Sequence, residues 1–211
     1  MKIAGGMQED GVVVGNAYDK YGSKNPVVRW LMNGFADALS GLVAKAAPRT
    51  IHEIGCGEGY WVFDWNKQGI EARGSDFSEK VIELARENAK DRGLSPDIFT
   101  PRSIYDIEQR RDTADLIVCC EVLEHLEYPK AGLAALQRVA SDYAIVSVPR
   151  EPIWCLLNMA RGKYLGSMGN TPGHIQHWSA KGFVALVGQY FDVIEIRKPL
   201  PWTMLLCRVK R

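Results

Sequence analysis

A glycine-rich heptapeptide is the part of the sequence best suited to bind a small molecule. It reads Glu53-Ile-Gly-Cys-Gly-Glu-Gly59, where an apolar segment gives way to a predicted helix. Glycines at alternate positions permit a tight bend and let a ligand approach the backbone where a Cβ atom would collide. A dinucleotide fingerprint would need glycine at position 60, which is tyrosine, and no Gly-Lys-Ser/Thr phosphate loop is present. The acidic Glu53, two places before the first glycine, suits a ligand that carries an ammonium group rather than a pyrophosphate.

A second carboxylate follows at the end of the next predicted strand, Gly74-Ser75-Asp76. A carboxylate at this position can accept hydrogen bonds from both hydroxyls of a ribose. The two segments together predict a nucleoside site.

A group of carboxylates and histidines forms a possible reaction centre. Glu121, Glu124 and His125 lie three and four residues apart and share a face if the segment coils helically, and His174 and His177 follow later. Carboxylates could hold a hard divalent ion such as Mg²⁺, which lowers the pKa of a bound hydroxyl. Alternatively, a histidine acts as a metal-free general base, or the group is structural. We expect the metal-free base, with His125 and His174 as the catalytic residues and no metal ligand.

Strands and helices alternate along the chain, which predicts a parallel sheet covered on both faces. The predicted strands are 50–54, 70–75, 97–100, 114–120, 143–148, 191–197 and 202–209. The predicted helices are 25–46, 58–67, 78–92, 129–140, 152–161 and 180–189. The last two strands are joined by Pro199-Leu200-Pro201, so we expect them to be antiparallel at one end of the sheet. His52 falls within the first predicted strand and is expected to be a satisfied core residue.

Two segments depart from this alternation. Residues 1–46 comprise a glycine-rich arm (1–22), expected to be loose or lid-like, and the first helix. Residues 151–178 form a predicted cap on the substrate side. Its apolar side chains suit an aromatic or lipid-like ligand; they are Trp154, Met159, Tyr164 and Met168.

Length and composition place the chain among ordinary globular proteins. The 211 residues predict one domain, and a net charge of +1 gives no electrostatic reason to expect binding to nucleic acid or to an anionic membrane. Five cysteines, two of them adjacent in an apolar run, indicate reduced thiols. No secretory signal and no membrane-spanning run is visible, so we expect a cytoplasmic protein.

Residues 49–148 resemble the class I S-adenosylmethionine-dependent methyltransferases. The resemblance rests on Glu-x-Gly-x-Gly-x-Gly with Asp76 on the next strand, on the segment 115–125 as the fourth strand and its loop, and on 145–149 as the fifth. It implies an α/β, Rossmann-like fold: a seven-stranded, mostly parallel sheet with the last strand antiparallel, helices on both faces and a small cap insertion. It also implies that residues 1–211 form a single methyltransferase domain.

The resemblance implies roles for the residues around the cofactor. Gly55, Gly57 and Gly59 would make room for the methionine part of S-adenosylmethionine, and Glu53 would support its amino group or the turn. Asp76 would bind the ribose, and Phe77 would form an apolar wall beside the adenine.

The other contacts implied by the resemblance are less regular. Where the family often has Gly-Asp after the third strand, this chain has Arg102-Ser103, so the adenine would be held by Ser103, the Ile104 backbone and stacking. Cys120 and Glu121 would line the sulfonium pocket, and Tyr21 of the arm would close over it.

The implied function is transfer of a methyl group from S-adenosylmethionine, leaving S-adenosylhomocysteine, to an oxygen of a small-molecule or lipid-like acceptor. Glu-x-x-Glu-His with a later histidine also resembles the metal sites of small-RNA 2′-O-methyltransferases and the arrangement in ubiquinone-biosynthesis O-methyltransferases. An RNA enzyme would need a basic track for phosphates, which the net charge of +1 does not favour. A non-catalytic S-adenosylmethionine-binding module is the third alternative. A divalent metal is possible but not favoured, no nucleic acid is expected, and the oligomeric state stays open.

Overall fold

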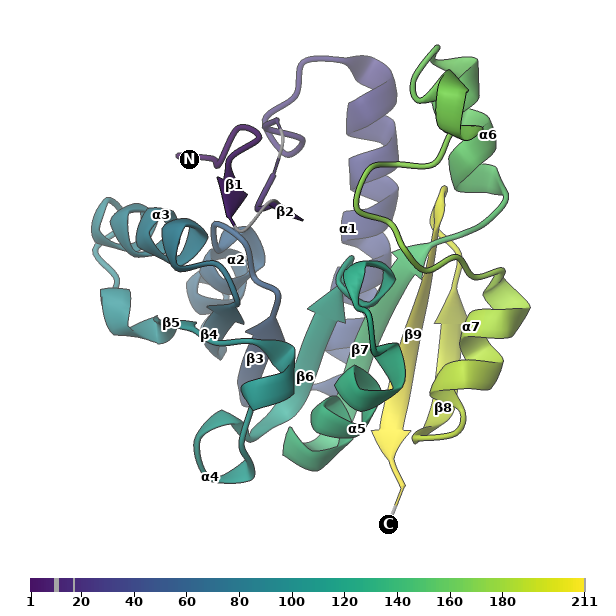
Figure 1. The fold of residues 1–211 in the computed structure, drawn as a ribbon. Coiled ribbons are helices and arrows are strands. Elements are labelled where there is room, and N and C mark those ends of the chain that lie inside the picture. Colours follow the sequence, from purple (N-terminus) through teal and green to yellow (C-terminus); the bar gives the residue numbers. More distant parts are fainter. Residues whose placement is uncertain (10–11, 17, 211) are drawn as a thin grey trace.

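A central mixed sheet organises the chain in the computed structural model, which describes residues 1–9, 12–16 and 18–210 (Figure 1). Within these residues the sheet has seven strands in the order β5-β4-β3-β6-β7-β9-β8. They are β3 (Thr50–Ile54), β4 (Glu71–Asp76), β5 (Phe99–Pro101), β6 (Ala114–Cys120), β7 (Ala140–Pro149), β8 (Phe191–Arg197) and β9 (Trp202–Val209).

The strand directions confirm the predicted fold class. The pairs β3–β4, β3–β6, β4–β5 and β6–β7 are parallel, whereas β9 is antiparallel to both β7 and β8. The predicted bounds of β3, β6, β8 and β9 agree with the structure, and β7 is longer than predicted because it begins at Ala140.

Helices cover both faces of the sheet, as predicted. They are α1 (Pro26–Ala46), α2 (Tyr60–Lys67), α3 (Glu79–Lys90), α4 (Gln109–Asp112), α5 (Pro129–Val139), α6 (Ile153–Ala160) and α7 (Ala180–Val187). Buried side chains of α1, α2 and α3 pack on one face, and those of α5 and α7 pack on the other. Short 3₁₀ helices lie in the loops: η1 (Pro96–Ile98), η2 (Ile104–Asp106), η3 (Leu123–His125) and η4 (Leu165–Ser167).

The central strand β6 is mainly apolar and is covered by helices on both faces of the sheet. Leu116 and Val118 belong to the core beneath α1 and α2, while Ile117 and Cys119 belong to the core beneath α5 and α7. Alternate side chains of a strand point to opposite faces, so a strand covered on both sides favours apolar residues at successive positions.

The N-terminal arm is packed against the domain, which differs from the expected loose segment. A two-stranded antiparallel sheet, β1 (Gln8–Glu9) with β2 (Val12–Val13), forms within it. Ala4 and Val14 are buried against Val81 of α3, and the backbone N–H of Lys2 donates to the Asn88 side chain at 2.8 Å. Gly5, Gly6 and Gly15, with φ of 61°, 87° and 62°, therefore occupy bends of an ordered segment.

The cap insertion differs from expectation in the direction of its apolar side chains. Trp154 of α6 turns inward, packing against the core beneath α1, whereas Met168, after η4, is 77% exposed. Met168 therefore does not line an apolar lid.

Among the described residues, no helix combines the length and apolar character needed to cross a membrane.

Candidate functional site

The glycine-rich turn joins β3 to α2, and all three of its glycines have positive φ: 80° at Gly55, 53° at Gly57 and 89° at Gly59. A Cβ atom at Gly55 would lie 2.2 Å from the Val122 side chain, and one at Gly59 would lie 2.5 Å from the Phe99 ring. At Gly57 the nearest atom would be 3.9 Å away, on the Asn16 side chain. Packing thus explains the glycines at positions 55 and 59, while Gly57 borders open space.

Asp76 lies at the end of β4, directly against this turn. Its carboxylate accepts the backbone N–H of Gly57 at 3.0 Å and that of Ser78 at 3.1 Å. Burial raises its pKa above the ordinary value. The next residue, Phe77, is 54% exposed, so its ring is free to contact a ligand. The two predicted contacts therefore stand side by side at the turn.

Glu53 is almost completely buried at the base of the turn. Its Oε2 atom has no hydrogen-bond partner among the described residues. Burial raises the pKa of this carboxyl group well above its usual range, and the Lys20 charge opposes the shift. A buried carboxylate oxygen without a donor is the kind of group that a cationic ligand can satisfy.

Glu58, also within the turn, was not recognised from the sequence as a functional position. Its carboxylate accepts the backbone N–H groups of Ala4 at 2.9 Å and of Asn16 at 2.8 Å, and the Asn16 side chain also donates to it. Glu58 therefore fastens the N-terminal arm beside the glycine turn. An acidic residue between two glycines was the available signal, but its partners lie too far away in sequence to be inferred.

Tyr21 lies over the start of α2. Its ring stacks on Tyr60 with centroids 3.7 Å apart and meets Trp61 edge-on at 5.7 Å. Burial, and then the nearby Glu53 carboxyl, raise the pKa of the Tyr21 hydroxyl well above its usual range. The arm therefore packs Tyr21 on the start of α2, next to the glycine turn, and its closure over the sulfonium pocket stays a prediction.

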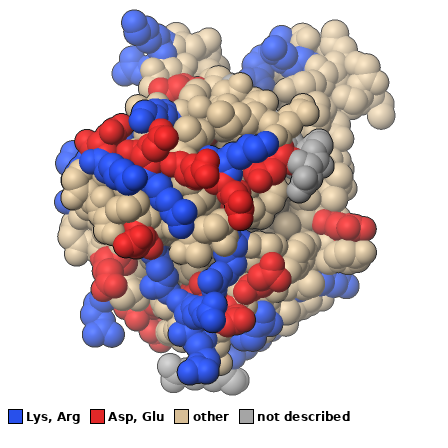
Figure 2. Space-filling view, turned by 60° about the vertical axis from the view of Figure 1, so that its left-hand side comes forward, with Lys and Arg blue, Asp and Glu red and all other residues tan. Residues whose placement is uncertain are grey.

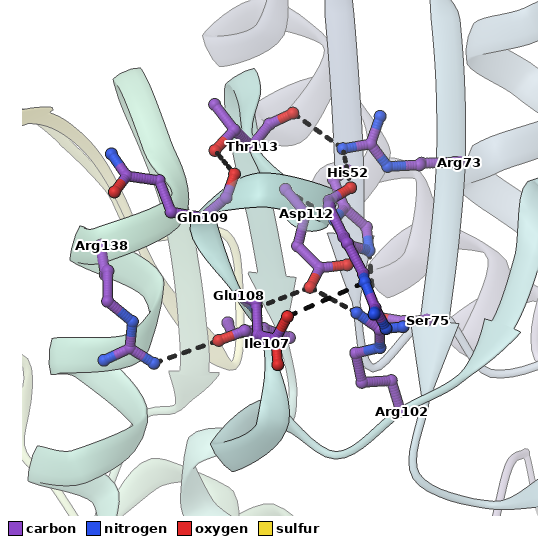
Figure 3. Close-up of polar contacts among 11 residues, drawn as sticks. His52, Arg73, Ser75, Arg102, Ile107, Glu108, Gln109, Asp112, Thr113 and Arg138 are labelled. Atoms are coloured by element: carbon purple, nitrogen blue, oxygen red, sulfur yellow. Dashed lines mark hydrogen bonds and ion pairs between the residues drawn. The ribbon is translucent and has the colours of Figure 1, made fainter.

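The segment after β5 contains Arg102-Ser103, where the family often has Gly-Asp. Arg102 forms an ion pair with Asp112 at 2.7 Å (Figure 3). Its backbone N–H donates to the Asp76 carbonyl at 2.7 Å. The Ser103 hydroxyl accepts the backbone N–H of Tyr105 at 3.3 Å, and the Ile104 side chain is buried in the core. Arg102 is thus bonded to other residues of the protein, and the Ser103 side chain caps the start of η2.

His52 is a satisfied core residue, as predicted. One ring nitrogen lies 3.0 Å from the Asp112 carbonyl oxygen and the other 3.0 Å from the Ser75 hydroxyl (Figure 3). Burial lowers the pKa of His52 to about 4, so its ring is neutral at physiological pH.

Cys120 ends β6, and Glu121 follows it in a left-handed conformation with φ of 59°. The Glu121 carboxylate accepts the Ser147 hydroxyl at 3.1 Å and the Trp202 indole N–H at 2.5 Å. Burial raises the pKa of Glu121 to about 7. Its side chain is therefore held against β7 and β9.

Glu124, His125 and His174 come together although about fifty residues separate the last two. Each offers a ligand atom, and these atoms all lie within 4.8 Å of one another. Both carboxylate oxygens of Glu124 are buried without a hydrogen-bond partner among the described residues, and burial raises its pKa well above the usual range. The structure groups three of the five polar residues singled out from the sequence; Glu121 and His177 lie outside the group.

Backbone contacts fix this group. The Glu124 carbonyl accepts the N–H groups of Ile175 and Gln176, both at 3.0 Å, which clamps the cap against η3. His125 Nδ1 donates to the Gly173 carbonyl at 2.9 Å, which leaves Nε2 as an acceptor. The route from His125 to His174 could not be traced in the sequence because it depends on this clamp.

Both histidines are neutral at physiological pH. Their rings meet edge-on with centroids 4.9 Å apart, and Trp154 stacks on His174 at 5.6 Å. Burial, and then the neighbouring histidines, lower the pKa of His174 to about 3, and burial lowers the pKa of His125. A neutral imidazole is the form required of a general base or of a metal ligand.

The sheet order and the glycine turn at the carboxyl end of β3 define a Rossmann-like domain with the fold of the class I S-adenosylmethionine-dependent methyltransferases. Residues 52–146 match the family model described as a methyltransferase domain. This match confirms the resemblance found in the sequence.

Individual proteins similar to this chain agree with that assignment. The ubiquinone biosynthesis O-methyltransferase of Hahella chejuensis is 27% identical over 138 residues, 64% of this chain and 56% of that protein. The protein of the same name from Methylococcus capsulatus is 25% identical over 157 residues, 67% of this chain and 65% of that protein. The chain thus spans about half to two thirds of the length of these curated relatives.

Solved structures share the fold at low sequence identity. Magnesium protoporphyrin IX methyltransferase from Synechocystis PCC 6803 with bound S-adenosylhomocysteine superimposes with a TM-score of 0.68 at 18% identity, covering 92% of this chain and 94% of that chain. The methyltransferase domain of bacterial CtHen1 gives a TM-score of 0.66 at 21% identity, covering 85% and 100%.

Removal of the Glu58 carboxylate should release the N-terminal arm. In Glu58→Ala the N–H groups of Ala4 and Asn16 lose their acceptor, and a buried unpaired donor costs about 1–3 kcal/mol. Urea unfolding should show this loss of stability, and limited proteolysis should cut the arm first. Glu71→Ala, which removes an exposed carboxylate on β4, is the control. Equal stability and equal protease resistance of the two variants would contradict the assigned role.

Proposed function

We propose that this chain binds S-adenosylmethionine at the glycine turn and transfers its methyl group to an oxygen of a small-molecule or lipid-like acceptor. The observation that carries the proposal is the juxtaposition of Asp76, joined to the turn by the Gly57 N–H, with the open space at Gly57. The names of the curated relatives and the bound product in one structural neighbour support the same cofactor and reaction.

The residues present fit a nucleoside that also carries positive charge. The unpaired oxygen of the buried Glu53 suits the cofactor's ammonium group, and Asp76 and Phe77 suit its ribose and adenine. The cofactor supplies an activated methyl group whose bond to sulfur breaks with both electrons going to sulfur. The protein would place the acceptor oxygen in line with that bond, which is a positioning task.

The Glu124, His125 and His174 group would receive the proton that the acceptor hydroxyl loses. In the version predicted from the sequence, the free Nε2 of His125, or His174, accepts it directly. In a second version, a divalent ion held by the three residues lowers the pKa of the acceptor hydroxyl. The specific observation that favours the ion is Glu124, whose two buried oxygens have no donor among the described residues.

Methyl transfer is tested directly with radiolabelled S-adenosylmethionine across phenols, catechols, prenylated phenols and a short RNA. We expect transfer to a phenolic hydroxyl and none to RNA. Transfer to RNA would establish the alternative enzyme class, and cofactor binding without transfer to any acceptor would support the non-catalytic module.

Asp76→Ala should weaken binding of S-adenosylmethionine and S-adenosylhomocysteine together, because both contain the ribose. Hydrogen bonds to a charged group contribute about 1.5–3 kcal/mol each. Isothermal titration calorimetry checks the affinities, thermal unfolding checks that the variant is folded, and Asp97→Ala on the exposed end of η1 serves as the control. Unchanged affinity in folded Asp76→Ala would contradict the assignment of Asp76 to the ribose.

Gly57→Val should abolish cofactor binding, because the new side chain would enter the open space beside the turn. Its matched control is Gly69→Val, since Gly69 also has positive φ (83°) and open space around its Cβ position. Both variants should lose similar stability from backbone strain, so only a binding defect specific to position 57 identifies a ligand site. Normal binding by folded Gly57→Val would place the cofactor elsewhere.

Chelation separates the two versions of proton removal. With a resident ion, EDTA should abolish transfer, Mg²⁺ or Mn²⁺ should restore it, and Glu124→Gln should weaken metal affinity. With a metal-free base, EDTA should have no effect, while His125→Ala or His174→Ala slows transfer roughly 10²–10⁴-fold and leaves cofactor affinity intact. His177→Ala, an exposed histidine outside the group, is the control.

A further inference from the structure

Residues 161–168 directly follow α6 in the cap. All eight are exposed, and they project from the domain. It contains two of the most exposed apolar side chains in the described part of the chain, Leu165 at 62% and Met168 at 77%, together with Tyr164 at 40%. Large apolar side chains gathered at one exposed tip mark an interaction surface more often than isolated ones do.

The tip is built by specific contacts. The buried Asn158 donates through its side chain to the Gly169 carbonyl at 2.8 Å, and its own carbonyl accepts the Lys163 N–H at 2.9 Å. A Cβ atom at Gly169 would lie 2.2 Å from the Cys155 carbonyl oxygen, so only glycine fits at this close approach. These contacts hold Leu165 and Met168 outward.

Backbone strain accompanies this arrangement. Tyr164 and Met168 have φ of 56° and 49°, a left-handed conformation that residues other than glycine rarely adopt. Strain of this kind persists where surrounding structure enforces it, and it is found preferentially at functional positions.

A second apolar projection lies at the same end of the molecule. At the start of α1, Val27 is 59% exposed and Trp30 is 62% exposed, three residues apart on one helix face. The start of α1 and the α6 region form the upper end in Figure 1. Aromatic contacts connect them beneath the surface: Phe35 of α1 meets Trp202 at 5.0 Å, and Trp202 meets Trp154 of α6 at 6.0 Å.

Both projections carry basic side chains, and the acidic residues nearest in sequence to the first, the exposed Asp19 and Asp37, flank it. No Asp or Glu occurs in residues 20–36 or in residues 152–191. Exposed cations flank the apolar side chains: Lys24, Arg29, Arg161 and Lys163. Figure 2 shows Lys and Arg side chains on both projections at the upper end of the molecule. The net charge of +1 is thus an average over an uneven surface.

We propose that these two projections dock onto an anionic lipid bilayer surface. Leucine, methionine and tryptophan side chains would enter the interfacial region, while the surrounding cations would meet anionic headgroups; together these give the two signals that stable peripheral binding requires. A second copy of the chain is a poorer partner, because a self-complementary contact would bring two sets of cations together. The proposal does not depend on methyl transfer, because it concerns a surface outside the glycine turn.

Vesicle co-sedimentation of the full chain tests the proposal without cofactor or acceptor. The protein should bind vesicles of phosphatidylcholine with phosphatidylglycerol, bind poorly to phosphatidylcholine alone, and release with rising salt. Leu165→Asp with Met168→Asp, and separately Lys24→Glu with Lys163→Glu, should each weaken binding by roughly tenfold or more. The controls are Ile196→Asp, an exposed apolar residue on β8, and Arg110→Glu on α4, which should bind as the unaltered protein does.

Three results would overturn the proposal. They are absence of binding to both kinds of vesicle, equal loss of binding in the control variants, and a dimer in light scattering that the Leu165→Asp, Met168→Asp variant dissociates. Thermal unfolding of each variant separates a lost surface from a lost fold. Calorimetry with S-adenosylhomocysteine, a separate readout, distinguishes failure of lipid binding from failure of the proposed function.

Discussion

The burial of four carboxyl groups at one edge of the sheet is the constraint on which the site depends. Glu53, Asp76, Glu121 and Glu124 lie at or just beyond the carboxyl ends of β3, β4 and β6, and burial raises the pKa of each. A buried carboxylate is costly unless donors or a cation compensate its charge. Backbone N–H groups partly compensate Asp76, and side-chain donors compensate Glu121. Glu53 and Glu124 keep unpaired oxygens, the kind of group that a positively charged ligand can satisfy.

The fold produces this arrangement because parallel strands end at the same edge. The glycine turn and Asp76 come from neighbouring strands, so a single backbone hydrogen bond joins them. The proposed acceptor side depends on a second contact, because its histidines lie on the loop after β6 and on the cap. The Glu124 carbonyl makes that contact by accepting two N–H groups of the cap. The proposed cofactor side is thus a product of sheet topology, and the proposed acceptor side is a product of one loop contact.

This difference explains what the sequence could predict. The strands, most helix bounds and the antiparallel β9 followed from hydrophobic periodicity and turn residues, which are local signals. The partners of Glu58 lie 42 and 54 residues away, and the clamp on Glu124 lies about fifty residues away, so no local signal identified them. The outward direction of Met168 depends on the left-handed turns at residues 164 and 168, which occur at non-glycine residues and therefore leave no mark in composition.

A net charge of +1 is compatible with the proposed membrane surface for a related physical reason. Screening confines each surface charge to a range of about 10 Å at ordinary ionic strength, so a planar partner responds to the local charge and not to the sum. Two acid-free stretches that are distant in sequence meet at one end of the molecule because Phe35, Trp202 and Trp154 pack in a chain beneath them. Trp154 also stacks on His174. Trp154 therefore joins the apolar and basic end to the proposed acceptor site, which would keep the reacting group near a lipid surface bound at that end.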